Sequence, residues 1–200
     1  MPTLSEAALA DLLKPYIAAP AVILPKLSEY LDLLLKWNAR TNLTAIREPE
    51  ETVRRHFGES LFAARHLGAC GTLLDLGSGA GFPGLPIALL RPEIHVTLAE
   101  SQGKKATFLR EVVRTLSLSN VEVWAARAEA MPGERRFHTV TLRAVDNMAA
   151  ALLAAEPRAI RRIVVLTSDS TAPALPGFSK QSRVSVPDSY GRILLIGERD

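Results

Sequence analysis

Cysteine is almost absent from this chain of 200 residues: Cys70 is the only one, so no disulfide can form within the chain. A single thiol excludes a zinc site built from several cysteines, and the four histidines lack the spacing of metal ligands, so no metal is expected. No apolar run reaches the roughly 18 residues that suggest a membrane span. The acidic Glu6 and Asp11 stand near the start, where a signal peptide would be basic and then apolar, so we expect a cytoplasmic protein.

Charge of either sign is also modest. Lysine and arginine number 24 and aspartate and glutamate 21, which gives a net charge of +3. Residues 1–70 hold eight basic and eight acidic side chains, so residues 71–200 carry the whole excess. This is a weak indication of a polyanionic partner, and an ordinary basic surface is the simpler interpretation. The length suits one domain with a small extension.

Apolar residues at helical spacing predict three helices before the first strand. The first covers residues 4–14, with Ser5 as its cap, and the second covers residues 24–40. The third opens at Pro49, followed by two glutamates that favour a helix N-terminus. Residues 1–70 are therefore expected to form an N-terminal helical extension.

Strands and helices alternate from residue 71 to the end, which predicts an α/β domain over residues 71–200 with a mostly parallel sheet and helices on both faces. In the strand 137–143, Thr139 and Thr141 are expected to face outward. Two final runs are expected to form an antiparallel hairpin, and residues 168–182 a loop. The other expected strands cover residues 73–76, 94–99, 121–125 and 163–167, the hairpin runs 183–186 and 192–197, and the helices 85–91, 104–118 and 147–155.

A glycine-rich turn follows the first strand, in residues 72–84 (TLLDLGSGAGFPG). A strand, a glycine loop and a helix in this order form the nucleotide-binding opening of Rossmann-like folds. Gly77, Gly79 and Gly81 can take positive φ and let a ligand rest against bare backbone. The amides at the start of the next helix then point at the ligand.

Two ligand classes use such a loop. Residues 79–84 match the dinucleotide pattern G-x-G-x-x-G, which supports NAD. Asp75, just ahead of the loop, favours S-adenosylmethionine (SAM), because an acid suits its cationic groups and would repel a pyrophosphate. Glu100 closes the second strand, 23 residues after Gly77, where an acid accepts hydrogen bonds from a ribose diol in both folds. SAM is the favoured ligand, and an NAD-dependent oxidoreductase is the first alternative.

Several separated strings resemble the RsmG (GidB) family of 16S ribosomal RNA guanine-N7 methyltransferases. Together they cover roughly residues 25–145, and their joint pattern is specific although no single piece is. They are residues 36–46 (KWNARTNLTAI), 55–61 (RHFGESL), 75–84 (DLGSGAGFPG), 103–109 (GKKATFL) and 127–129 (RAE).

The resemblance implies a Rossmann-like SAM methyltransferase that modifies a guanine N7 in 16S rRNA, on naked RNA or on the small ribosomal subunit. We also expect a monomer. It implies RNA contacts in the segment 36–61, where we select Asn42, Arg54 and His56. Arg143 is the implied catalytic residue. Position by position, the implied cofactor contacts are Gly77, Phe82, Ala128, Glu129 and Arg143, to which the loop and ribose considerations add Gly79, Gly81 and Glu100.

The chain departs from the family pattern in four places. Glu59 and Glu100 stand where the family usually has aspartate, so the charge is kept with a longer reach. After the helix near residue 155, the Pro-Gly-Gly turn and the Lys-Gly at the end of the next strand are both missing, and residues 159–168 read AIRRIVVLTS. The strand itself remains, so the fold is expected to survive. These losses motivate the second alternative, a catalytically inactive rRNA-binding relative. A SAM enzyme for small molecules is the third.

Overall fold

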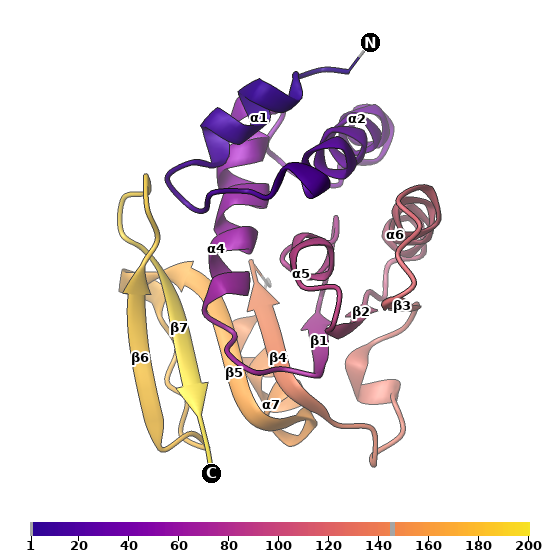
Figure 1. Cartoon of the computed structure of the whole chain (residues 1–200). Coiled ribbons are helices and arrows are strands. Elements are labelled where there is room, and N and C mark those ends of the chain that lie inside the picture. Colours follow the sequence, from indigo (N-terminus) through magenta and orange to yellow (C-terminus); the bar gives the residue numbers. More distant parts are fainter. Residues whose placement is uncertain (1, 145–146) are drawn as a thin grey trace.

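A seven-stranded sheet forms the centre of the computed structural model, which describes residues 2–144 and 147–200. The strand order is β3-β2-β1-β4-β5-β7-β6, parallel from β3 to β5, with β7 antiparallel to both of its neighbours. The arrows of β4 and β7 accordingly point in opposite directions in Figure 1. The expected sheet and its antiparallel hairpin are confirmed. The strands are β1 (Thr72–Leu76), β2 (His95–Ala99), β3 (Val121–Trp124), β4 (Phe137–Arg143), β5 (Ala159–Ser168), β6 (Lys180–Ser185) and β7 (Arg192–Glu198).

Every helix expected from the sequence is present. Ser5 caps α1 by accepting a hydrogen bond from the Ala8 amide at 3.2 Å, and Pro25 lies in the first turn of α2. The α-helices are α1 (Glu6–Leu13), α2 (Leu24–Thr41), α3 (Pro49–Thr52), α4 (Glu59–Arg65), α5 (Gly84–Leu90), α6 (Gly103–Thr115) and α7 (Met148–Ala155). Short 3₁₀ turns are η1 (Ala21–Ile23), η3 (Ala128–Ala130), η4 (Glu156–Arg158) and η5 (Asp169–Thr171).

The helix expected from Pro49 onward contains a π-helical segment. Between α3 and α4, the chain winds as the π-helix η2 (Val53–Gly58), which the spacing of the apolar residues does not reveal. Single π-turns within α-helices are rare, and those that occur are frequently found at functional sites. Here the segment carries Arg55 and His56 toward the end of β4, where both contact Arg143.

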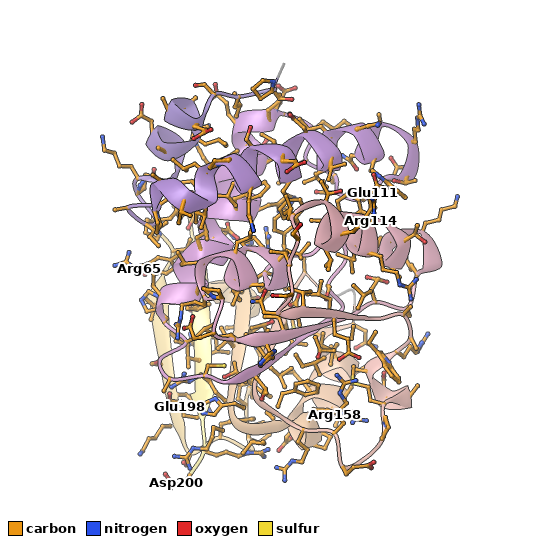
Figure 2. All side chains as sticks on the ribbon, turned by 45° about the vertical axis from the view of Figure 1, so that its right-hand side comes forward. Arg65, Glu111, Arg114, Arg158, Glu198 and Asp200 are labelled. Carbon is orange, nitrogen blue, oxygen red and sulfur yellow. The ribbon has the colours of Figure 1, made fainter. Side chains whose placement is uncertain are left out.

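The two faces of the sheet are covered by different helices (Figure 1). On one face, Leu73 packs in a core with residues of α1, α2, α4, α5 and α6, so the N-terminal helices and the sheet share one hydrophobic core. Also on this side, the indole N–H of Trp37 on α2 donates to Glu111 on α6 at 3.1 Å, which is labelled in Figure 2. On the other face, Leu74 packs in a second core with Ala151 and Ala155 of α7.

The expected outward direction of two threonines in β4 is wrong. Thr139 and Thr141 are fully buried, although they alternate with Val140 and Leu142 as predicted. A parallel sheet covered by helices on both sides has no solvated face, so alternation of polar and apolar residues does not identify an outside. Their hydroxyls find internal partners: Thr141 donates to Asp75 at 2.7 Å.

The strand order places two loops side by side at one end of the sheet. β1 and β4 are neighbours, and the chain winds away from them in opposite directions, which makes a crevice beyond their carboxyl ends. The glycine loop follows β1 there, and Arg143 is the last residue of β4. The loop expected over residues 168–182 is shorter than predicted, since it contains η5 and ends where β6 begins at Lys180. Among the described residues, no helix combines the length and the apolar character that crossing a membrane requires.

Candidate active site

The glycine loop is held in place by its own backbone. Gly77 and Ser78 donate their amide hydrogens to the carbonyl of Ala99 on β2, each at 3.0 Å. The hydroxyl of Tyr30 on α2 donates to the carbonyl of Ala80, so α2 also holds the loop in place. Positive φ angles of 72°, 58° and 95° at Gly77, Gly79 and Gly81 confirm that the turn needs glycine.

The glycines of the loop face different surroundings. A Cβ added at Gly81 would lie 2.3 Å from Leu85 and 2.6 Å from the Tyr30 hydroxyl, so that glycine is required by packing. At Gly79 the nearest heavy atom to such a Cβ is 3.9 Å away, which leaves open space in front of the backbone. Gly79 is therefore the position where bare main chain of the loop faces open space.

Asp75 lies inside the molecule rather than at the surface of the loop. Its carboxylate is 1% exposed and accepts hydrogen bonds from the Gly84 amide at 3.1 Å and from the Thr141 hydroxyl. Burial raises the pKa of Asp75 to about 6, against which these two hydrogen bonds act. The residue joins the start of α5 to β4 and keeps a negative charge beneath the loop at neutral pH.

Glu100 stands where the ribose contact is expected. One of its carboxylate oxygens accepts the Gly79 amide at 2.9 Å and the other the Gln102 amide at 2.7 Å. A carboxylate offers about four acceptor sites, so this acid can still receive ribose hydroxyls. Ala128 packs in the same core as Leu76 and Ala99, the last residues of β1 and β2.

Phe82 ends the loop within a group of aromatic rings. Its ring stacks on His56 with centroids 4.7 Å apart and on Tyr30 at 5.3 Å, and it meets Phe57 edge-on at 5.2 Å. The guanidinium of Arg143 lies 5.9 Å from the Phe82 ring. Phe82 therefore joins the cofactor-side loop to the helices of the N-terminal segment.

Arg143 is buried, and one of the two amino groups of its guanidinium forms hydrogen bonds. Its Nη2 donates to the Arg55 carbonyl at 2.7 Å and to His56 Nδ1 at 2.8 Å, and lies 3.5 Å from the Glu59 carboxylate. Its Nη1 has no hydrogen-bond partner among the described residues. Burial lowers the pKa of Arg143 to about 10, so the side chain remains a cation at pH 7. A buried donor without a partner costs stability unless a ligand satisfies it.

His56 connects Arg143 to the segment after α2. Its Nδ1 accepts from Arg143, so its proton is on Nε2, which lies 2.7 Å from the Thr44 hydroxyl. Thr44 is held in turn, because its amide donates to the Asn38 side chain at 2.9 Å. Of the residues selected for RNA contacts, His56 is thus beside Phe82 and Arg143.

The other two selected RNA contacts lie elsewhere. Asn42 ends α2 with φ of 45°, and its side chain accepts from Arg47 at 3.1 Å. Arg54 pairs with Glu50 at 3.3 Å on the surface of the third helix. Glu129, next to Ala128 in η3, is exposed. The side-chain partners of Asn42 and Arg54 thus belong to the N-terminal segment itself, and the roles of these two residues and of Glu129 remain predictions.

Comparison with known families and folds identifies the family of this chain. The family model for GidB, described as rRNA small subunit methyltransferase G, matches residues 23–173. The chain belongs to the GidB family. The match contains every residue selected for the cofactor and for RNA, and it ends before β6 and β7 begin.

Two relatives carry the name ribosomal RNA small subunit methyltransferase G. That of Xylella fastidiosa (strain M23) is 52% identical over 128 residues, and that of Stenotrophomonas maltophilia (strain K279a) is 50% identical over 129 residues. Each match covers 64% of this chain, but only 59% and 60% of the respective relative. The chain therefore spans less than two thirds of the length of these GidB proteins.

Solved structures show the same fold. The 16S rRNA N2 G1207 methyltransferase RsmC of T. thermophilus matches with a TM-score of 0.56 and 19% identity, over 72% of this chain and 42% of that one. The magnesium protoporphyrin IX methyltransferase ChlM of Synechocystis PCC 6803 matches with a TM-score of 0.56 and 13% identity, over 86% and 97% of the two chains. The fold is thus that of methyltransferases.

The strand that lacks the family's flanking turn and Lys-Gly end is still formed. β5 runs from Ala159 to Ser168 and pairs with β4 and β7. Arg158, just before it, donates from its guanidinium to the carbonyls of Met131, Pro132 and Arg135, and so ties the start of β5 to the segment between η3 and β4 (Figure 2). The missing elements leave the sheet intact, as expected from the sequence.

Important residues of the site are not predicted by the sequence patterns. The segments that resemble the family contain Thr44 and Glu59, and Tyr30 lies near them. A sequence match, however, does not indicate which side chains point into the protein. No sequence pattern indicates a role for Arg192, because it is 133 positions from its partner Glu59 and lies outside the region that matches the family.

The imidazole of His56 is expected to stay neutral, with its proton on Nε2, from about pH 8 down to about pH 5. Burial, together with the positive charges of Arg143, Arg55 and Arg192, lowers the pKa of His56 from 6.5 to about 2. Long-range ¹H–¹⁵N NMR spectra report the tautomer directly. Titration of this ring near pH 6.5 would contradict the geometry.

The same shift predicts a pH dependence of stability. In acid, the unfolded chain binds a proton at this histidine while the folded chain does not, so stability falls below about pH 6.5, by up to about 1.4 kcal/mol per pH unit. The raised pKa of Asp75 in the folded state increases stability as pH falls below about 6. This contribution cancels in a comparison of the wild type with His56→Gln, because both proteins contain Asp75. The wild type should therefore lose up to about 1.4 kcal/mol of unfolding free energy per pH unit relative to His56→Gln as pH falls below about 6.5. Urea unfolding of both proteins at several pH values measures this difference.

Proposed function

We propose that this chain transfers a methyl group from SAM to N7 of a guanine in 16S rRNA of the small ribosomal subunit. The single observation that carries the proposal is the arrangement at the carboxyl ends of β1, β2 and β4: bare main chain facing open space at Gly79, Glu100 bonded to the Gly79 amide, and the unpartnered Nη1 of buried Arg143. Membership of the GidB family supports the rRNA substrate.

The residues of the crevice fit SAM. Glu100 would receive the ribose hydroxyls, and Gly77, Gly79, Gly81 and Phe82 would form the wall along the donor. Ala128 and Glu129 would lie on the adenine side, beyond the end of β3. Arg143 would donate from Nη1 to the donor's carboxylate, which supplies the missing partner of a buried cation. When bound, SAM supplies an electrophilic methyl group on a positively charged sulfonium.

The target atom explains why no general base is needed in the crevice. Guanine N7 has a lone pair and no proton, so it forms the new bond to carbon without prior deprotonation. The task of the protein is to hold the reacting atoms in line, and positioning of this kind supplies on the order of 7–11 kcal/mol of barrier reduction. The base must leave its stack to reach the crevice. His56 and Phe82, stacked on each other, form the side from which an unstacked base would approach.

RNA contacts complete the proposal. Asn42 and Arg54 lie in the N-terminal segment, residues 1–70. We propose that this segment faces the RNA and that residues 71–200 form the SAM domain. We propose that the enzyme works as a monomer in the cytoplasm and needs no metal. Among the described residues, no group of three or more histidine, cysteine or acidic side chains is arranged to hold a metal ion.

Two binding assays and one transfer assay test the proposal against its alternatives. Calorimetry should give heat on titration with SAM or its demethylated product and none with NADH, whereas the reverse result would support the oxidoreductase. Methyl-labelled SAM should then label small-subunit RNA or particles. An inactive relative would retain the RNA on a filter but leave it unlabelled, and this outcome would overturn the proposed activity.

A further inference from the structure

The buried acid Glu59 lies at the centre of three arginines. Its side chain is fully buried, and its Oε1 accepts from Arg55 Nε at 3.0 Å and from Arg192 Nε at 2.7 Å. Its Oε2 accepts from Arg192 Nη2 at 2.8 Å and lies 3.5 Å from Arg143 Nη2. These arginines come from the π-helix, from β7 and from β4, so one carboxylate joins three elements that are far apart in the sequence.

The contacts around Glu59 determine how Arg143 is oriented. A guanidinium is planar and rigid, so fixing one of its amino groups fixes the direction of the other. Nη2 of Arg143 is held by the Arg55 carbonyl and His56 of η2 and by the charge of Glu59 at the start of α4. These contacts also fix the orientation of Nη1, which has no partner among the residues that the structure describes.

The bridge from Glu59 to Arg192 brings the antiparallel edge of the sheet into this arrangement. Arg192 begins β7, opposite Ser168 at the end of β5, at the same end of the sheet as Arg143. Its pairing with Glu59 is bidentate and its side chain is 19% exposed, the geometry in which an arginine–carboxylate pair is strongest.

We infer that Glu59 is a positioning residue, which together with Arg192 holds Arg143 so that its free amino group faces the bound donor. This inference rests on the proposed function, since it assigns how the proposed cofactor contact is prepared. It extends the site to a residue of the C-terminal hairpin, beyond the region that matches the family.

Three variants and one matched control test the inference. Glu59→Gln removes the charge, Glu59→Asp keeps it, and Arg192→Gln loosens one side of the bridge without leaving Glu59 unpaired. Glu198→Gln is the control, because Glu198 pairs with Arg162 at the opposite end of the same strand β7 (Figure 2). Arg192→Gln also serves if Glu59→Gln does not fold.

For Glu59→Gln and Arg192→Gln, we expect kcat to fall at least tenfold and KM for the donor to rise, with KM for RNA unchanged. Glu59→Asp should recover most of the kcat lost in Glu59→Gln, and Glu198→Gln should match the wild type. A purely structural role would reduce the active fraction and leave both KM values alone. Equal kcat in Arg192→Gln and Glu198→Gln, or no recovery in Glu59→Asp, overturns the inference.

A spectroscopic measurement separates this inference from the proposed function. Restricted rotation of the Arg143 guanidinium should give resolved side-chain ¹⁵N signals in the wild type, which merge or broaden in Arg192→Gln but not in Glu198→Gln. This result does not depend on methyl transfer, so it stands if the wild type proves inactive. Unchanged Arg143 signals in Arg192→Gln would show that the bridge does not position this side chain.

Discussion

Replacement of Arg143 by glutamine is expected to reduce methyl transfer to RNA by on the order of 100-fold or more, because a preorganised charged donor is lost from the crevice. The affinity for SAM should fall as well, since a charge-assisted hydrogen bond to the donor's carboxylate disappears. The protein should remain folded, because Glu59 keeps Arg55 and Arg192 as partners. Single-turnover transfer rates and calorimetry with SAM measure the two effects separately.

Arg158 provides the control for this substitution. It is as buried as Arg143, at 7% exposure against 8%, but it donates to backbone carbonyls at the other end of the sheet. Arg158→Gln should reduce thermal stability and leave the SAM affinity of the folded protein unchanged. If Arg143→Gln behaves in the same way as Arg158→Gln, then Arg143 is a structural residue and its place in the site is wrong.

Replacement of Gly79 by valine is expected to abolish SAM binding and leave a folded protein. A Cβ at this position has no heavy atom closer than 3.9 Å apart from those of its chain neighbours, so we expect the valine side chain to project into the space in front of the loop, where the donor would lie. Its φ of 58° adds backbone strain, which for a residue other than glycine costs roughly 1–2 kcal/mol. Calorimetry should detect no heat on titration with SAM, while circular dichroism keeps the wild-type spectrum.

Gly191→Val separates the strain from the obstruction. Gly191 has a φ of 65° and no heavy atom within 4 Å of an added Cβ, but it lies in the turn between β6 and β7. Both variants should lose similar stability, and only Gly79→Val should lose the donor. Wild-type affinity in Gly79→Val would mean that the donor does not lie against this part of the loop.

The order of strands and the place of the loop follow from local sequence patterns. Short apolar runs and glycines mark where strands end, and parallel sheets then bring those ends together. This is why the sequence alone predicts that Gly79, Glu100 and Arg143 lie at the same end of the sheet, as the structure shows. The same patterns predict the antiparallel hairpin, since the last two short runs have no crossover helix between them.

Side-chain direction and distant pairing do not follow from such patterns. Alternation indicates two faces and so places Thr139 and Thr141 outside, but helices cover both faces here. The π-helix η2 has no sequence signal, and it sets which helix residues face β4. Arg192 reaches Glu59 only because β7 inserts between β5 and β6, a placement that depends on the whole sheet.

Asp75 illustrates how a correct motif can conceal its physical role. Its charge favours a cationic ligand from the sequence alone, yet its carboxylate is committed to Gly84 and Thr141 inside the loop. The acid bonded to the part of the loop that faces open space is Glu100, which accepts the Gly79 amide. Two acids therefore lie at the loop: Asp75 holds its structure, and Glu100 is the one that we propose to contact the ligand.

Nucleoside analysis of the methylated RNA tests the central claim most directly. Unmodified small-subunit RNA or particles are incubated with the protein and isotopically labelled SAM, digested to nucleosides and separated by mass spectrometry. We predict labelled 7-methylguanosine as the product, which is absent when Gly79→Val replaces the wild type and present with Gly191→Val. Label on a different atom or base, or no label although the wild type binds SAM, would contradict the account.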